Sequence, residues 1–75
     1  NNRGIKIMEY LKALKLNYEA LLVVAMVNLR NYMNNSVGVA EHPNIIASMD
    51  GLVEEIAAAQ EKLAVVEDLL EKTAE

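Results

Sequence analysis

The most constraining feature of this chain is the spacing of apolar residues in its second half. One row of residues recurs at alternating intervals of three and four positions and consists of Met49, Leu52, Ile56, Ala59, Leu63, Val66, Leu70 and Thr73. An average interval of 3.5 residues keeps one side of an α-helix facing a partner helix over its whole length. The pattern therefore predicts a long helix that requires another helix to pack against.

The first half of the chain offers that partner. The predicted inward row of this helix has the same spacing and consists of Ile7, Leu11, Leu14, Tyr18, Leu21, Ala25, Asn28 and Tyr32. Between Ala20 and Val27 every direction around the helix is apolar, which is typical of a helix that is covered on more than one side. One partner helix cannot cover that belt, so a second molecule is expected.

The boundaries follow from residues that end and start helices. Helices are predicted over residues 5–33 and 44–72, and residues 34–43, which include Gly38 and Pro43, form the connecting loop. Asp50 could cap a fresh helix and leave a short separate turn before it, but the apolar row continues through this point and favours one continuous helix. The predicted fold is all-α, an antiparallel two-helix hairpin in a single domain spanning residues 1–75.

The small size of the chain predicts that the hairpin associates with another molecule. A compact chain of 75 residues buries only about 60% of its unfolded surface, and an elongated hairpin buries less. Dimerisation into a four-helix bundle would supply the missing burial. The residues expected at the oligomer interface are Leu14, Tyr18, Leu21, Val24, Ala25, Asn28, Ile56 and Leu63.

Charge and composition narrow the class of partner. The net charge is −4, divided into +3 for residues 1–34 and −7 for residues 35–75, so the two helices are expected to dock through opposite charges. Nucleic-acid binding requires clustered basic residues without such a partner, and no nucleic-acid partner is predicted. The longest apolar run, Ala20 to Val27, has eight residues against about 20 for a membrane span, and no membrane partner is predicted. The chain has no cysteine, and a small chain without disulfides fits the cytoplasm.

Few residues suggest chemistry. His42 is the only histidine, whereas a metal site usually requires three or four ligands, so no metal or cofactor is expected. No phosphate-binding glycine loop or nucleophile set is present, and the chain is predicted not to be an enzyme. Asn28 has two interpretations: a ligand contact, or a buried polar residue that fixes helix register, the second being favoured.

The loop is the remaining candidate for a specific role. Val37 and Val39 place apolar groups where polar residues would suffice for a turn, beside Glu41 and His42. These valines either fold back over the end of the bundle, which is favoured, or form a small patch that docks a protein partner.

Two segments carry a resemblance. Residues 35–44, Asn-Ser-Val-Gly-Val-Ala-Glu-His-Pro-Asn, and residues 17–25, Asn-Tyr-Glu-Ala-Leu-Leu-Val-Val-Ala, precede an acidic helix. Together they resemble a pattern in small uncharacterised proteins of marine cyanobacterial viruses. The resemblance implies no activity or functional residue, only a viral or environmental origin and, for a viral protein, the cytoplasm of the host cell.

Two functions from different classes remain. The leading hypothesis is a self-associating helical module, most simply a homodimer, that acts as a structural, assembly or accessory protein. The alternative is a regulatory adaptor that presents its first helix to one heterologous protein partner. The sequence identifies neither the pathway nor that partner.

Overall fold

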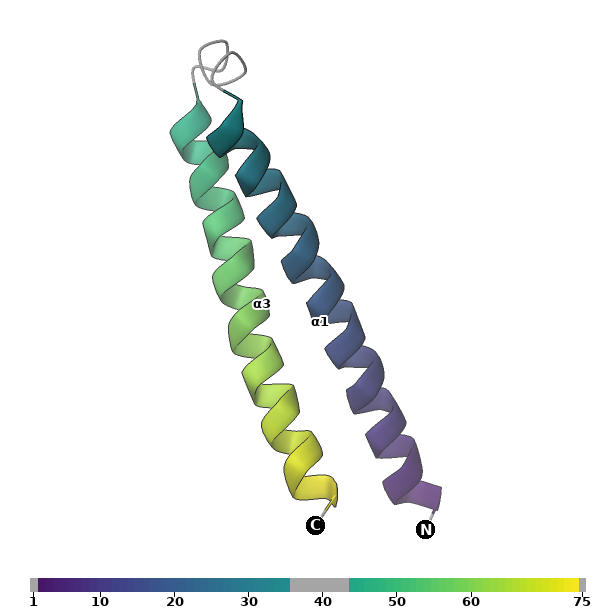
Figure 1. The fold of residues 1–75 in the computed structure, drawn as a ribbon. Helices are drawn as coiled ribbons and strands as arrows, with labels where there is room; N and C mark the ends of the chain where they lie inside the picture. The colour runs from purple at the N-terminus through teal and green to yellow at the C-terminus, as the bar shows by residue number, and fades with distance from the viewer. Residues whose placement is uncertain (1, 36–43, 75) are drawn as a thin grey trace.

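The computed structural model describes residues 2–35 and 44–74, and these form two long α-helices with no β-strand among them. Helix α1 spans Asn2–Asn34 and helix α3 spans Ile45–Ala74. Figure 1 shows the two helices side by side, with both chain termini at the same end of the molecule. The predicted all-α class is confirmed. The molecule is a rod, with extents of 57 × 14 × 14 Å.

Helix α3 is continuous from its first turn to its last. Its start is marked by the backbone N–H of Ser48, which donates to the carbonyl of Asn44 at 3.0 Å. The helix then runs through Asp50 and Gly51 without interruption, so the prediction of one continuous helix is confirmed. Near its end, Lys72 pairs with Asp68 at 3.0 Å, one turn earlier on the same exposed surface.

The side of α3 that faces α1 is the one expected from its apolar spacing. Every member of the predicted row from Met49 to Leu70 is buried or half-buried. Thr73 is the exception, since it is exposed and its hydroxyl donates to the carbonyl of Leu69 at 2.7 Å. The row therefore ends at Leu70, one position earlier than predicted.

The side of α1 that faces α3 differs from the prediction. The less exposed row consists of Met8, Leu11, Lys15, Tyr18, Leu22, Ala25, Leu29 and Tyr32. It shares Leu11, Tyr18, Ala25 and Tyr32 with the predicted row. The other predicted members are wrong, because Ile7, Leu14, Leu21 and Asn28 are exposed.

The physical reason is that α1 has two apolar rows with the same spacing. Both contain Leu11, Tyr18, Ala25 and Tyr32. They differ in whether the helix turns Ile7, Leu14, Leu21 and Asn28, or the residue after each of these, toward α3. The observed orientation half-buries Lys15 between the helices, which is possible because its long alkyl stem can pack while the ammonium reaches water.

The contact between the two helices forms a thin core. Among the described residues only Ala25, Ala59 and Val66 are buried, at 2%, 5% and 5% exposure. No polar or charged side chain is buried there. Small side chains let the helices approach closely, but they remove little apolar surface from water. Most of the apolar surface of the hairpin therefore remains exposed.

Candidate functional site

The candidate site is the exposed apolar surface that the hairpin leaves uncovered. Fifteen large hydrophobic side chains of the described residues are exposed, far more than isolated surface leucines and valines would explain. They are Ile5, Ile7, Tyr10, Leu14, Leu16, Leu21, Val23, Val24, Met26, Val27, Met33, Ile46, Val53, Val65 and Leu69. Val27 lies on the side of α1 that points away from α3. The other fourteen lie on the two sides of the hairpin that are described below.

One side is hollowed by two open grooves between the helices. The groove nearer the termini has a volume of about 430 Å³, and its lining includes Leu14, Tyr18, Val65 and Leu69. The groove nearer the loop has a volume of about 570 Å³, and its lining is more polar. That lining includes Asn28, Asn31, Asn35, Ser48, Gly51 and Glu55. The two grooves follow one another along the same side of the molecule, because their linings belong to the same rows of both helices.

These rows define what we call the groove face. On α1 the row repeats at intervals of three and four residues and consists of Ile7, Tyr10, Leu14, Asn17, Leu21, Val24, Asn28 and Asn31. On α3 it consists of Ser48, Gly51, Glu55, Ala58, Lys62, Val65, Leu69 and Lys72. The row on α1 has no charged residue. Toward the termini the groove face is mostly apolar, with Asn17, Lys62 and Lys72 as its polar members, and toward the loop it becomes polar.

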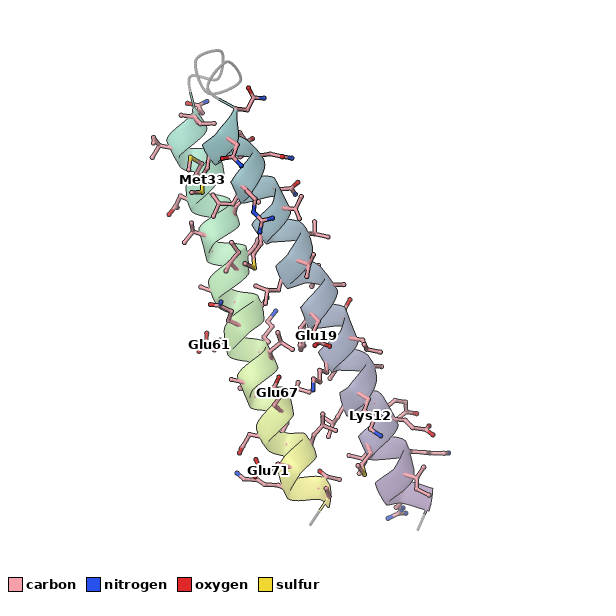
Figure 2. All side chains as sticks on the ribbon, in the orientation of Figure 1. Lys12, Glu19, Met33, Glu61, Glu67 and Glu71 are labelled. Carbon is pink, nitrogen blue, oxygen red and sulfur yellow. The ribbon has the colours of Figure 1, made fainter. Side chains whose placement is uncertain are left out.

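The other side, which we call the opposite face, alternates apolar and charged residues. Figure 2 shows Lys12 and Glu19 of α1 with Glu67 and Glu71 of α3 on the side turned toward the reader. Exposed apolar side chains such as Val23 and Met33 lie among further charges on this face. Interface centres are depleted in charged residues, and the groove face, whose charges all belong to α3, is closer to that composition.

The structure separates the predicted interface residues into two groups. Tyr18, Ala25, Ile56 and Leu63 lie between α1 and α3. Leu14, Leu21, Val24 and Asn28 lie exposed on the groove face. The interpretation of Asn28 as a buried residue that fixes register is therefore wrong for the hairpin itself.

The predicted docking loop is not part of the described structure, and part of the groove face was not predicted. Val37, Val39, Glu41 and His42 lie outside the described residues, so that hypothesis stays a prediction. Sequence reasoning did not single out Tyr10, Asn17, Val65 or Leu69. Tyr10, Asn17 and Val24 recur every seven residues, and this repeat was the available signal.

Polar contacts between the helices are few. The ammonium of Lys62 lies 5.6 Å from the centre of the Tyr18 ring. This is a cation–π contact at the rim of the apolar groove. Within the described part of the chain the only ion pair joins Lys72 and Asp68, both on α3. The predicted docking of oppositely charged helices therefore involves no direct ion pair between described residues of α1 and α3.

Among the described residues we looked for two further features, a metal site and a membrane span. The described residues contain no group of three or more histidine, cysteine, aspartate or glutamate side chains placed to hold a metal ion. Neither α1 nor α3, as described, has a stretch long and apolar enough to span a bilayer. Comparisons with known proteins find no matching protein family, curated protein or solved structure.

Proposed function

We propose that this protein is a non-enzymatic, self-associating helical module that dimerises into a four-helix bundle and acts as a structural, assembly or accessory protein. The observation that supports the proposal is the surface area of one hairpin. Its solvent-accessible surface is 5845 Å². A folded monomer of 8.3 kDa is expected to expose about 4,600 Å² by area scaling. Each chain therefore exposes roughly 1,200 Å² more than a chain of its mass usually does.

Two chains that cover this excess would bury roughly 2,500 Å² in total, which falls within the range of obligate homodimer interfaces. The radius of gyration leads to the same inference, because 16.9 Å is well above the roughly 11 Å of a compact chain of this length. A second hairpin laid along the first widens the rod into a bundle without changing either helix.

A regulatory adaptor is the second candidate, and the exposed valines of the apolar belt favour it. Val23, Val24 and Val27 are 59%, 57% and 45% exposed. A helix of another protein could also cover this surface. In that function the free protein would be a folded monomer. The oligomeric state therefore separates the two candidates.

The experiment is sedimentation equilibrium from micromolar to millimolar protein, with circular dichroism recorded at each concentration. We expect a dimer whose helicity falls as dilution dissociates it, because the thin core of one hairpin does not hold the two helices together. A strongly helical monomer over the whole range would contradict self-association and favour the adaptor.

A further inference from the structure

We propose that the second copy docks on the groove face with the two hairpins antiparallel, α1 packed against α1 and the two-fold axis passing by Asn17. This inference rests on the proposed function, since it assigns the surface and the geometry of that self-association.

The charges on α1 select the face on which a second copy docks. Between residues 7 and 35 the row of α1 on the groove face has no charged side chain, whereas the row of α1 on the opposite face contains Glu9, Lys12, Glu19 and Arg30. Desolvating a charge without a partner is costly. A second copy therefore covers the groove face at lower cost. This face also contains the apolar groove lined by Leu14, and side chains of a second copy can fill that groove.

The apolar residues around Asn17 fix the orientation of the two hairpins. Within the row of α1, Leu14 and Leu21 lie on either side of Asn17 at nearly equal distance along the chain, and Tyr10 and Val24 lie beyond them. Two copies related by an axis at Asn17 place Leu14 against Leu21 and Tyr10 against Val24. All four apolar residues then meet apolar partners, because the part of the row from Tyr10 to Val24 is apolar on both sides of Asn17.

Asn17 itself suits a position on the two-fold axis. This residue is exposed in the hairpin and is the one polar member of the row between Ile7 and Val24. An asparagine amide has both donor and acceptor groups, so two such amides facing each other across a two-fold axis can satisfy one another. A single buried asparagine is also a known determinant of register and oligomeric state in coiled coils. Asn17 thus takes the role that the sequence suggested for Asn28.

The alternative orientation places both loops at the same end of the bundle. It sets α1 of one copy against α3 of the other and brings the polar halves of both groove faces into contact. Asn28, Asn31 and Glu55 would then be enclosed. The antiparallel arrangement sets the row of α1, which has no charged residue, against its own copy, whereas the alternative sets it against Glu55, Lys62 and Lys72 of α3. This is the physical reason for preferring it.

Disulfide trapping tests the geometry, because the chain has no cysteine of its own. Asn17→Cys and Asn31→Cys replace the same residue type in the same row, two heptads apart. In a glutathione redox buffer we expect Asn17→Cys to form a disulfide-linked dimer, since its mate lies across the axis. Asn31→Cys should not, because its mate lies about 42 Å away by helix rise. Gln60→Cys, an exposed residue on the opposite face, is the control for random collision.

A second pair of variants tests Asn17 without a thiol. Asn17→Asp places two carboxylates against each other, so the dissociation constant measured by sedimentation should rise at least tenfold. Asn31→Asp adds the same charge two heptads from the axis, where it does not face its own mate, and should change the dissociation constant less than threefold. If the wild type is a dimer but Asn17→Cys does not cross-link and Asn17→Asp is neutral, the geometry is wrong and self-association stands. A monomeric wild type overturns both.

Discussion

The substitution Val24→Glu gives the sharpest test of how this protein associates. Val24 is 57% exposed in one hairpin and belongs to the apolar row of the groove face. Its neighbour Val23 is 59% exposed but lies on the opposite face, about 100° around the helix. The two valines are matched in size, exposure and distance along α1. They differ in the surface to which they belong.

The expected change in the dissociation constant follows from the part of the Val24 side chain that is still exposed in one hairpin. Complete burial of a valine stabilises by about 1.5–3 kcal/mol, so the exposed part of Val24 can contribute roughly 1–1.5 kcal/mol per chain. The dimer contains two copies, and losing both contributions costs roughly 2–3 kcal/mol before any charge is desolvated. At about 1.4 kcal/mol per tenfold change, Val24→Glu should raise the dissociation constant at least about 30-fold.

The assay is sedimentation equilibrium of Val24→Glu and Val23→Glu side by side, each at the concentrations that dissociate the wild type. Glutamate has a slightly higher helix propensity than valine, so neither substitution weakens the helix of the free chain. We expect Val23→Glu to keep the wild-type dissociation constant within about threefold, because its carboxylate stays in water. An unchanged mass for Val24→Glu, or equal dissociation by both variants, would refute the assignment of the interface.

Three smaller predictions concern the hairpin itself. Gly51→Ala should raise the free energy of unfolding by about 0.5–1 kcal/mol in thermal melts, because the added methyl group meets no atom within 4 Å in the middle of a helix; a loss of stability would contradict this reasoning. Ala59→Leu should lower the free energy of unfolding by about 1–3 kcal/mol, because Ala59 is 5% exposed and the helices would have to separate to hold a leucine. An unchanged thermal melt would contradict the close approach of the two helices at this residue. Asp68→Asn should lower the free energy of unfolding by about 0.3–0.5 kcal/mol at low salt, because its ion pair with Lys72 is exposed. Concentrated salt should screen that pair and abolish the difference, and a cost that persists there would rule out the ion pair as its cause.

Helix α3 shows how much the sequence determines when its pattern is unambiguous. Its apolar row is flanked by glutamate, aspartate and lysine, so only one side of the helix can face a partner. The sequence therefore predicted the buried side of α3 from Met49 to Leu70, and it also predicted the continuity of the helix through Gly51. The error at Thr73 lies in the last turn, where the helix extends beyond the contact.

Helix α1 shows where the sequence stops being sufficient. Its belt from Ala20 to Val27 is apolar in every direction, so two rows sharing Tyr18 and Ala25 satisfy the same spacing. Only the packing of α1 against α3 decided that Leu22 turns inward and that Leu21 stays exposed.

The candidate site depends on that choice. Helical periodicity gives the angle between two side chains on one helix, and it does not give the direction in which the helix faces its neighbour. Once α1 had taken Leu22 and Leu29 into the contact with α3, the row containing Leu14, Asn17 and Leu21 remained exposed beside the grooves. The sequence thus determined that the chain has more apolar surface than one hairpin can cover. The tertiary structure decided which part of that surface is left, because packing one side of a helix exposes the other.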